Sequence, residues 1–255
     1  MLERAEHLRS IDRDRDDLAA AIRLAARFDL HEGICNHFSV QCDAPPDEPD
    51  AERYLINAYG WHWSEVTPER LLLIDGDGNV LDGEGPDGEG EVEASALHIH
   101  VASHRANPRH KAILHVHMPY ATALSMLQGG RLLYAHQTAC RFHGRIGYEE
   151  EFGGIAVTAD EGERLARTAR ANAAYDTMVL ANHGVVCAGA TVAQAFDDLY
   201  YLERAARQQV LAQSTGQPLA IIPDETVART AEQFRADFPV YAARHFEALK
   251  RLVAC

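Results

Sequence analysis

The sequence has little cysteine, and the five residues present (Cys35, Cys42, Cys140, Cys187 and Cys255) are odd in number and widely spaced. No C-x-x-C pair occurs among them. Disulfide frameworks and cysteine zinc sites both depend on cysteines at characteristic spacings. The sequence therefore predicts neither, and it fits a reducing compartment.

An excess of positive charge and a long apolar run are also missing. The chain has 38 acidic and 24 basic side chains, and its net charge of −14 opposes contact with nucleic acid or with anionic lipid. No apolar run approaches the length of a membrane span, and the first residues lack the apolar core of a signal peptide. We therefore expect a soluble cytoplasmic protein with no nucleic-acid partner and no membrane partner.

Two familiar catalytic motifs give no support for a function either. Residues 83–88 match G-x-G-x-x-G letter for letter, but Glu84 and Asp87 would place negative charge against a pyrophosphate. No G-x-S-x-G sequence occurs, and no cysteine lies beside an evident activating group. Dinucleotide binding and nucleophilic catalysis therefore have no candidate residues.

Hydrophobic residues, in contrast, make up 47% of the 255 residues, which is enough for a sizeable core in an α/β unit. We expect a single domain over residues 1–255. Apolar periodicity and capping signals at Thr158 and Thr191 predict helices over residues 16–29, 89–107, 163–172, 193–212 and 225–253. Short segments rich in β-branched or large apolar residues predict strands within residues 38–41, 53–59, 71–83, 112–117 and 177–186.

The most informative segment is Leu114-His115-Val116-His117, because side chains two residues apart on a strand point to the same side. A third histidine, His183, follows another apolar segment and precedes Gly184, which permits a sharp turn. Three neutral imidazoles with one open position are a usual arrangement for catalytic zinc. With 14 histidines in the chain, the alternative is that the H-x-H pair arose by chance.

These motifs and others resemble the class II aldolase/adducin pattern. The resemblance lies in residues 33–39 (GICNHFS), 107–127 (NPRHKAILHVHMPYATALSML) and 180–186 (LANHGVV), and in the order of INAYGWHWSEVT, DGNV, EFGG and FDDLYYLER. It implies a three-layer αβα fold with a central mixed, largely antiparallel sheet. It also implies that His115, His117 and His183 bind a divalent metal, that the substrate is a small molecule, and that the protein is a homotetramer with sites between subunits.

The chain departs from this pattern at the acid/base position. In the sugar-phosphate aldolases of the family, a glutamate on the helix before the H-x-H strand moves the proton, and ungapped counting places that position on Ala96. Glu93 and His100 lie on the same face of the predicted helix, so we expect one of them to replace the missing group. The alternative is that Glu93 only favours the start of a helix and that His100 packs in the core.

Substrate-binding positions are retained only in part. By the resemblance, Asn36, Gly60 and Ser95 occupy positions that contact substrate phosphate, but Tyr59 and Ala94 replace small hydroxyl residues, which argues against a phosphorylated substrate. A catalytic tyrosine that reaches across from the neighbouring subunit in the family falls near His136. We also expect Arg141 to meet a substrate carboxylate, the alternative being an interface or surface arginine.

Three functions follow from these patterns. The first is a metal-dependent carbon-carbon lyase, either a decarboxylase or an aldolase, acting on a small oxygenated carbonyl or carboxylate compound. The second is a non-haem iron oxygenase on the same three histidines. The third is a non-catalytic binding or scaffold role like that of adducin. For the metal we expect zinc, with iron, manganese and cobalt as alternatives.

Overall fold

The computed structural model describes residues 2–154, 164, 167, 170–171 and 175–254. The helices of this part of the chain are α1 (Leu2–Arg27), α2 (Ala94–Ala106), α3 (Pro119–Ser125), α4 (Gln137–Cys140), α6 (Val192–Gln213), α7 (Asp224–Ala236) and α8 (Phe238–Lys250), with short 3-10 turns η1 (Trp63–Glu65) and η2 (Pro68–Arg70). The strands are β1 (His37–Cys42), β2 (Arg53–Asn57), β3 (Leu71–Asp75), β4 (Val80–Asp82), β5 (Ala112–Val116), β6 (Ile146–Glu149), β7 (Thr177–Leu180) and β8 (Gly184–Gly189).

The strands form one eight-stranded sheet in the order β4-β3-β2-β1-β5-β8-β7-β6. Only the β6–β7 pair is parallel, and every other neighbouring pair is antiparallel. The first four strands form the predicted meander, and strand β5 then pairs with β1 so that His37 lies opposite His115. The predicted mixed, largely antiparallel sheet is confirmed.

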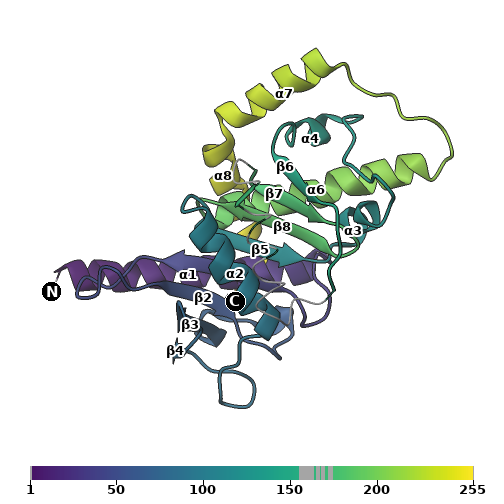
Figure 1. Ribbon diagram of the computed structural model, residues 1–255. Coiled ribbons are helices and arrows are strands. Elements are labelled where there is room, and N and C mark those ends of the chain that lie inside the picture. The colour runs from purple at the N-terminus through teal and green to yellow at the C-terminus, as the bar shows by residue number, and fades with distance from the viewer. Residues whose placement is uncertain (1, 155–163, 165–166, 168–169, 172–174, 255) are drawn as a thin grey trace.

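Helices cover both faces of this sheet, as Figure 1 shows with α2 on one side and α1 and α6 on the other. The larger core lies between the sheet and α1, α6 and α8, where Leu114 and Val116 of β5 are fully buried. A smaller core lies under α2, where Tyr54 and Ile56 of β2 pack against Ala96. Strand β5 therefore runs through the middle of the protein with helices on both sides, which is the expected three-layer arrangement.

Most predicted elements occur where the sequence placed them. Thr191 caps α6 by accepting a hydrogen bond from the backbone N–H of Gln194, and Asn107 ends α2. The predicted capping residue Thr158 lies outside the described residues. The terminal helical region is divided at Asp237 into α7 and α8. None of the helices in the described part of the chain combines the length and hydropathy that a bilayer-spanning segment needs.

Helix α1 is longer than predicted, because it begins at Leu2 rather than near residue 16. Its first half carries alternating charges and so shows no apolar stripe, which is why the pattern gave no signal there. One charged side chain, Arg15, is nevertheless buried, and its guanidinium donates to the carbonyls of Pro68 and Leu71 and to the carboxylate of Asp82. Polar contacts to the meander thus hold a segment that lacks an apolar face.

Candidate metal centre

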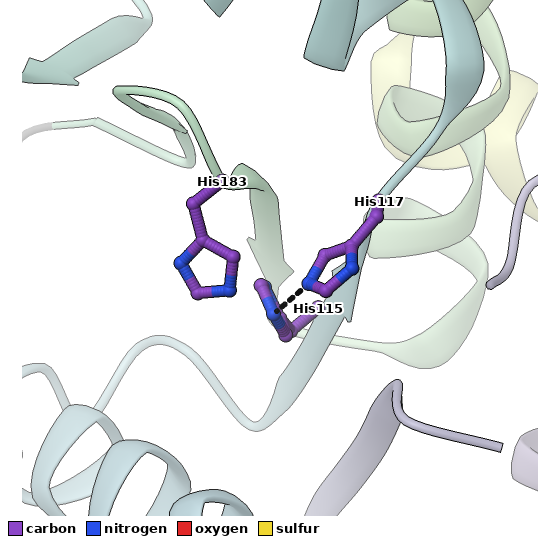
Figure 2. Close-up of side chains that lie close together, drawn as sticks. All are labelled: His115, His117 and His183. Atoms are coloured by element: carbon purple, nitrogen blue, oxygen red, sulfur yellow. Dashed lines mark hydrogen bonds between the residues drawn. The ribbon is translucent and has the colours of Figure 1, made fainter. Parts of the chain in front are cut away.

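Two structural elements bring three imidazole rings together. His115 lies in the buried strand β5, His117 follows the strand directly, and His183 lies in the turn between β7 and β8 (Figure 2). The three ring centroids lie 4.8–5.0 Å apart in pairs. At Gly184 a side chain is excluded, since a Cβ there would lie 2.6 Å from the carbonyl oxygen of Val116. The turn can therefore approach β5 closely enough to present His183 to the other two rings.

The hydrogen bonds of His115 and His117 fix which ring nitrogen carries the proton. Nδ1 of His115 lies 3.0 Å from the backbone carbonyl of Val185, and Nδ1 of His117 lies 2.6 Å from the carboxylate of Glu32. Carbonyl and carboxylate oxygens accept hydrogen bonds, so in each neutral ring Nδ1 carries the hydrogen and Nε2 keeps a lone pair. The two Nε2 atoms face each other at 3.2 Å (Figure 2).

This arrangement fits a shared cation. Two lone pairs at 3.2 Å repel each other unless a positive charge lies between them or one ring takes up a proton. His115 is 1% exposed, and burial, with the neighbouring imidazoles, lowers its pKa well below the ordinary value of 6.5. Protonation is thus disfavoured at the buried ring, and one ligand atom from each of the three histidines lies within 4.8 Å of the others. Three imidazole nitrogens facing an accessible space match the donor set of an open divalent-metal site.

A cavity of about 750 Å³ opens in front of the three rings. Its polar lining residues include His37, Glu93 and Asn182, and its apolar lining residues include Ile99, Met126 and Phe152. A space of this size accommodates a small organic molecule beside the three imidazole rings. The mixed lining suits a substrate that has both oxygen atoms and an apolar part.

Behind the cavity, four buried side chains form a continuous hydrogen-bonded series. Nδ1 of His37 lies 2.7 Å from Nε2 of His100, and the Ser39 hydroxyl contacts Nδ1 of His100 and lies 2.7 Å from Nε2 of His104. Nδ1 of His104 then donates to the carbonyl of His110 at 2.9 Å. Burial lowers the pKa of His37 to about 3 and that of His104 to about 4, so these rings are neutral at physiological pH.

The structure separates the two residues considered as acid/base. Glu93 lines the cavity, and its carboxylate also accepts the backbone N–H of Ala96 at the start of α2. His100 lies behind the wall, 2% exposed, between His37 and Ser39. Ala96 itself is 1% exposed and packs with Tyr54 and Ile56 in the smaller core. In this chain the position found by ungapped counting therefore belongs to the interior of the protein.

The three predicted substrate-binding residues have different surroundings. The Oδ1 atom of Asn36 accepts hydrogen bonds from the backbone N–H groups of Glu32 and His117, while its Nδ2 atom is buried without a hydrogen-bond partner in the described part of the chain. Gly60 has φ +100° in the turn after β2, where a Cβ would meet Pro86 at 2.8 Å. Ser95 lies in the first turn of α2, and its side chain is outside the described residues.

Two further predicted site residues, His136 and Arg141, do not line this cavity in the single chain. The His136 side chain caps α4 by accepting a hydrogen bond from the backbone N–H of Thr138, and it is exposed. The Arg141 guanidinium is buried in ion pairs with Asp197 and Asp198 and lies over the Tyr201 ring. These contacts give Arg141 a structural role that the sequence pattern did not indicate, and its contact with a substrate carboxylate stays a prediction.

Sequence reasoning missed the parts played by His37 and Glu32. A signal for the first was present, because His37 and Ser39 are two residues apart on a predicted strand and so share one face. What the sequence did not supply is the register that places His37 opposite His115. Glu32 gave no signal, since its contact with His117 joins residues 85 positions apart.

Named relatives include proteins of different activities. An adducin-related protein of Schizosaccharomyces pombe is 35% identical over 193 residues, which cover 73% of this chain and 55% of that protein. Decarboxylase NovR of Streptomyces niveus is 31% identical over 216 residues, covering 84% of this chain and 75% of the enzyme. A 4-hydroxy-3-prenylphenylpyruvate oxygenase/4-hydroxy-3-prenylbenzoate synthase of Streptomyces roseochromogenus subsp. oscitans is 31% identical over 218 residues, covering 84% and 73%. This chain thus spans little more than half of the adducin-related protein.

Solved structures agree with the sequence relationship. An aldolase II superfamily protein from Pseudomonas syringae superposes with a TM-score of 0.84 at 35% identity, covering 96% of this chain and 93% of that one. The L-fuculose 1-phosphate aldolase from Glaciozyma antarctica PI12 superposes with a TM-score of 0.78 at 26% identity, covering 94% and 90%. Enzymes of the class II aldolase type depend on a divalent metal ion, and the three-histidine group supplies a matching donor set. Since the family described as Class II Aldolase and Adducin N-terminal domain also matches residues 16–210, this chain belongs to that family.

Proposed function

We propose that the protein is a metal-dependent carbon-carbon lyase acting on a small oxygenated carbonyl or carboxylate compound, with decarboxylation as its reaction. The observation that carries this proposal is the pair of Nε2 lone pairs of His115 and His117, which face each other at 3.2 Å beside His183 and an open cavity. A bound divalent cation supplies Lewis acidity, which stabilises negative charge on a substrate oxygen. Zinc is the metal that we propose for this site.

The residues of this chain divide the remaining work. His115, His117 and His183 hold the cation, while the apolar wall with Ile99 and Phe152 keeps water from the carbon that reacts. In decarboxylation the bond to the carboxylate carbon breaks and CO₂ leaves. The electron pair moves into the adjacent carbonyl, and the carbon then takes a proton. Glu93 lines the cavity and is the group that we assign to deliver this proton.

The burial of Ala96 supports decarboxylation over aldol cleavage. Aldol chemistry requires a base to take the proton of a substrate hydroxyl before the carbon-carbon bond breaks, whereas decarboxylation forms its carbanion without that step. Ala96 supplies no such base and packs in the core, while the carboxylate of Glu93, which also caps α2, is the group that we assign to deliver a proton rather than to take one. The named decarboxylase among the relatives is consistent with this choice.

The proposal is tested with protein reconstituted separately with zinc, manganese, cobalt and iron. A panel of 2-oxo, 3-oxo and 2-hydroxy acids is screened for release of CO₂ and of aldehyde. We expect CO₂ from a subset of these compounds, loss of turnover in His115→Ala, and a loss of about 10²–10⁴-fold in Glu93→Gln. Glu91→Gln, an exposed neighbour, is the matched control. Metal-loaded protein that releases neither product from any compound would contradict the proposal and favour an adducin-like binding role.

A second candidate is an iron-dependent oxygenase, which the name of one relative favours. Three neutral imidazoles leave coordination positions for both dioxygen and substrate. Substrate-dependent oxygen uptake with iron and none with zinc would select this function over decarboxylation. We also propose that the protein is a cytoplasmic homotetramer. Light scattering on the same preparation gives the mass of the assembly and so tests the tetramer.

A further inference from the structure

The hydrogen-bonded series behind the metal centre has a direction that can be worked out atom by atom. Its members are His37 and Ser39 of β1 and His100 and His104 of α2, all at most 3% exposed. The last contact joins Nδ1 of His104 to the backbone carbonyl of His110. A carbonyl only accepts hydrogen bonds, so Nδ1 of His104 carries the hydrogen.

Each remaining assignment follows from this one, because a neutral imidazole has one donor and one acceptor nitrogen. With its hydrogen on Nδ1, His104 accepts at Nε2, and the Ser39 hydroxyl must be the donor to it. That hydroxyl has a single hydrogen, so towards His100 it accepts, and Nδ1 of His100 carries a hydrogen. Nε2 of His100 is then an acceptor, and Nδ1 of His37 is the donor to it.

From this series we infer that His37 is a specificity-determining residue whose Nε2 lone pair accepts a hydrogen bond from a hydroxyl group of the substrate. His37 lines the cavity, and its ring centroid lies 4.9 Å from that of His115. Its Nε2 atom makes no hydrogen bond to any residue that the structure describes, which leaves that atom for a ligand. The inference rests on the proposed function, because it defines the substrate of the same site.

The substrate class follows from the role of the His37 Nε2 atom as a hydrogen-bond acceptor. A lone pair attracts an O–H or N–H donor and repels an anionic oxygen, so phosphate or carboxylate groups are disfavoured at this point. We therefore assign the site to carbonyl or carboxylate compounds that carry a hydroxyl group next to the carbonyl or carboxylate group.

Neutron diffraction from deuterated crystals of the complete chain tests the hydrogen assignment without any ligand. The expected map has deuterium on Nδ1 of His37, His100 and His104, and the deuterium of the Ser39 hydroxyl points to Nε2 of His104. Nε2 of His37 should be bare. Deuterium on Nε2 of His37 would overturn the inference whatever the protein catalyses.

A pair of probes tests the specificity in metal-loaded protein. Glycolate has the hydroxyl group and methoxyacetate has its methyl ether, and titration calorimetry gives the ratio of their affinities. We expect this preference for glycolate to fall about 5–10-fold in His37→Leu. The preference for glycolate should also fall several-fold in Ser39→Ala. Ser39 does not touch the ligand, but its hydroxyl group fixes the hydrogen positions of His100 and His104. Ser103→Ala, also on the α2 side of the sheet, is the matched control.

Equal weakening of both probes in Ser39→Ala, with an unchanged ratio, would show that the series only stabilises the fold and would overturn the inference. Failure of both probes to bind the metal-loaded wild type, in contrast, would count against the proposed function. In that case the hydrogen positions at His37 still decide the assignment on their own. Failure of the inference about His37 and failure of the proposed function therefore give different results.

Discussion

The carboxylate of Glu32 lies 2.6 Å from Nδ1 of His117, so a residue of the loop after α1 orients a ring that we propose as a metal ligand. Removing such a partner from a ligand histidine costs about 10–100-fold in metal affinity. The Glu32 side chain is 71% exposed, so we expect Glu32→Gln to weaken metal affinity by only about tenfold, near the lower end of this range. Competition with a chromophoric chelator measures this, and Glu6→Gln on α1 should leave the affinity unchanged.

The buried ion pairs of Arg145 provide a test of the packing around α6. Its guanidinium lies 2.5 Å from Asp198 and 2.9 Å from Asp176, and the Asp198 side chain is 1% exposed. Arg145→Met removes the nearer of the two guanidinium groups from this buried carboxylate, which then keeps only Arg141 at 3.9 Å, and should lower the free energy of unfolding by about 3–5 kcal/mol. Lys111→Met, which removes an exposed pair with Asp43, should cost no more than about 1 kcal/mol. Urea denaturation at one protein concentration compares the two, and equal losses would contradict the account.

Replacement of Ala96 tests whether a side chain at this position faces the core or the cavity. Because Ala96 packs among apolar side chains under α2, Ala96→Glu should lower the free energy of unfolding by about 2–4 kcal/mol and should not create aldolase activity. Ala102→Glu, at a partly exposed position of the same helix, should cost about 0.5 kcal/mol or less. A stable Ala96→Glu variant that gains aldol cleavage would show that this position faces the cavity.

Glu203 of α6 should make stability depend on pH. Its carboxylate accepts the backbone N–H groups of Tyr120 and Ala121 at 2.8 and 2.9 Å, yet burial raises its pKa from 4.5 to about 7. A carboxyl with a raised pKa binds its proton more tightly in the folded state, so its contribution to stability is greatest below pH 4.5 and is lost as the pH rises towards 7. The loss should reach at most about 3 kcal/mol.

Unfolding curves between pH 4 and 8 measure this effect, with Glu203→Gln compared against the wild type. The variant should lose less stability than the wild type over that interval, while Glu232→Gln, an exposed glutamate of α7, should follow the wild type. Identical pH profiles for wild type and Glu203→Gln would mean that the pKa of Glu203 does not differ between the folded and the unfolded state.

Much of the fold was predictable because strand and helix periodicity is local. The alternation around β5 placed His115 and His117 on one side of a strand, and Gly184 indicated the turn that carries His183. Helix α1 was predicted only in part, since Arg15 and its polar contacts replace the apolar stripe on which such predictions depend.

The surroundings of the site were less predictable because they depend on strand pairing and on contacts between distant segments. His37 reaches the cavity only through the β1–β5 register, which no local pattern specifies. Counting residues back from His115 identified Ala96 but not its side-chain direction, and that direction depends on how α2 packs on the sheet.

The central claim is that three imidazoles share one cation, and X-ray diffraction at the absorption edge of the bound metal tests it most directly. Crystals grown with stoichiometric zinc should show a single anomalous peak about 2.0–2.1 Å from one nitrogen each of His115, His117 and His183. The peak should vanish in His115→Ala and persist in His143→Ala. A metal-saturated crystal without a peak between these rings would contradict the account.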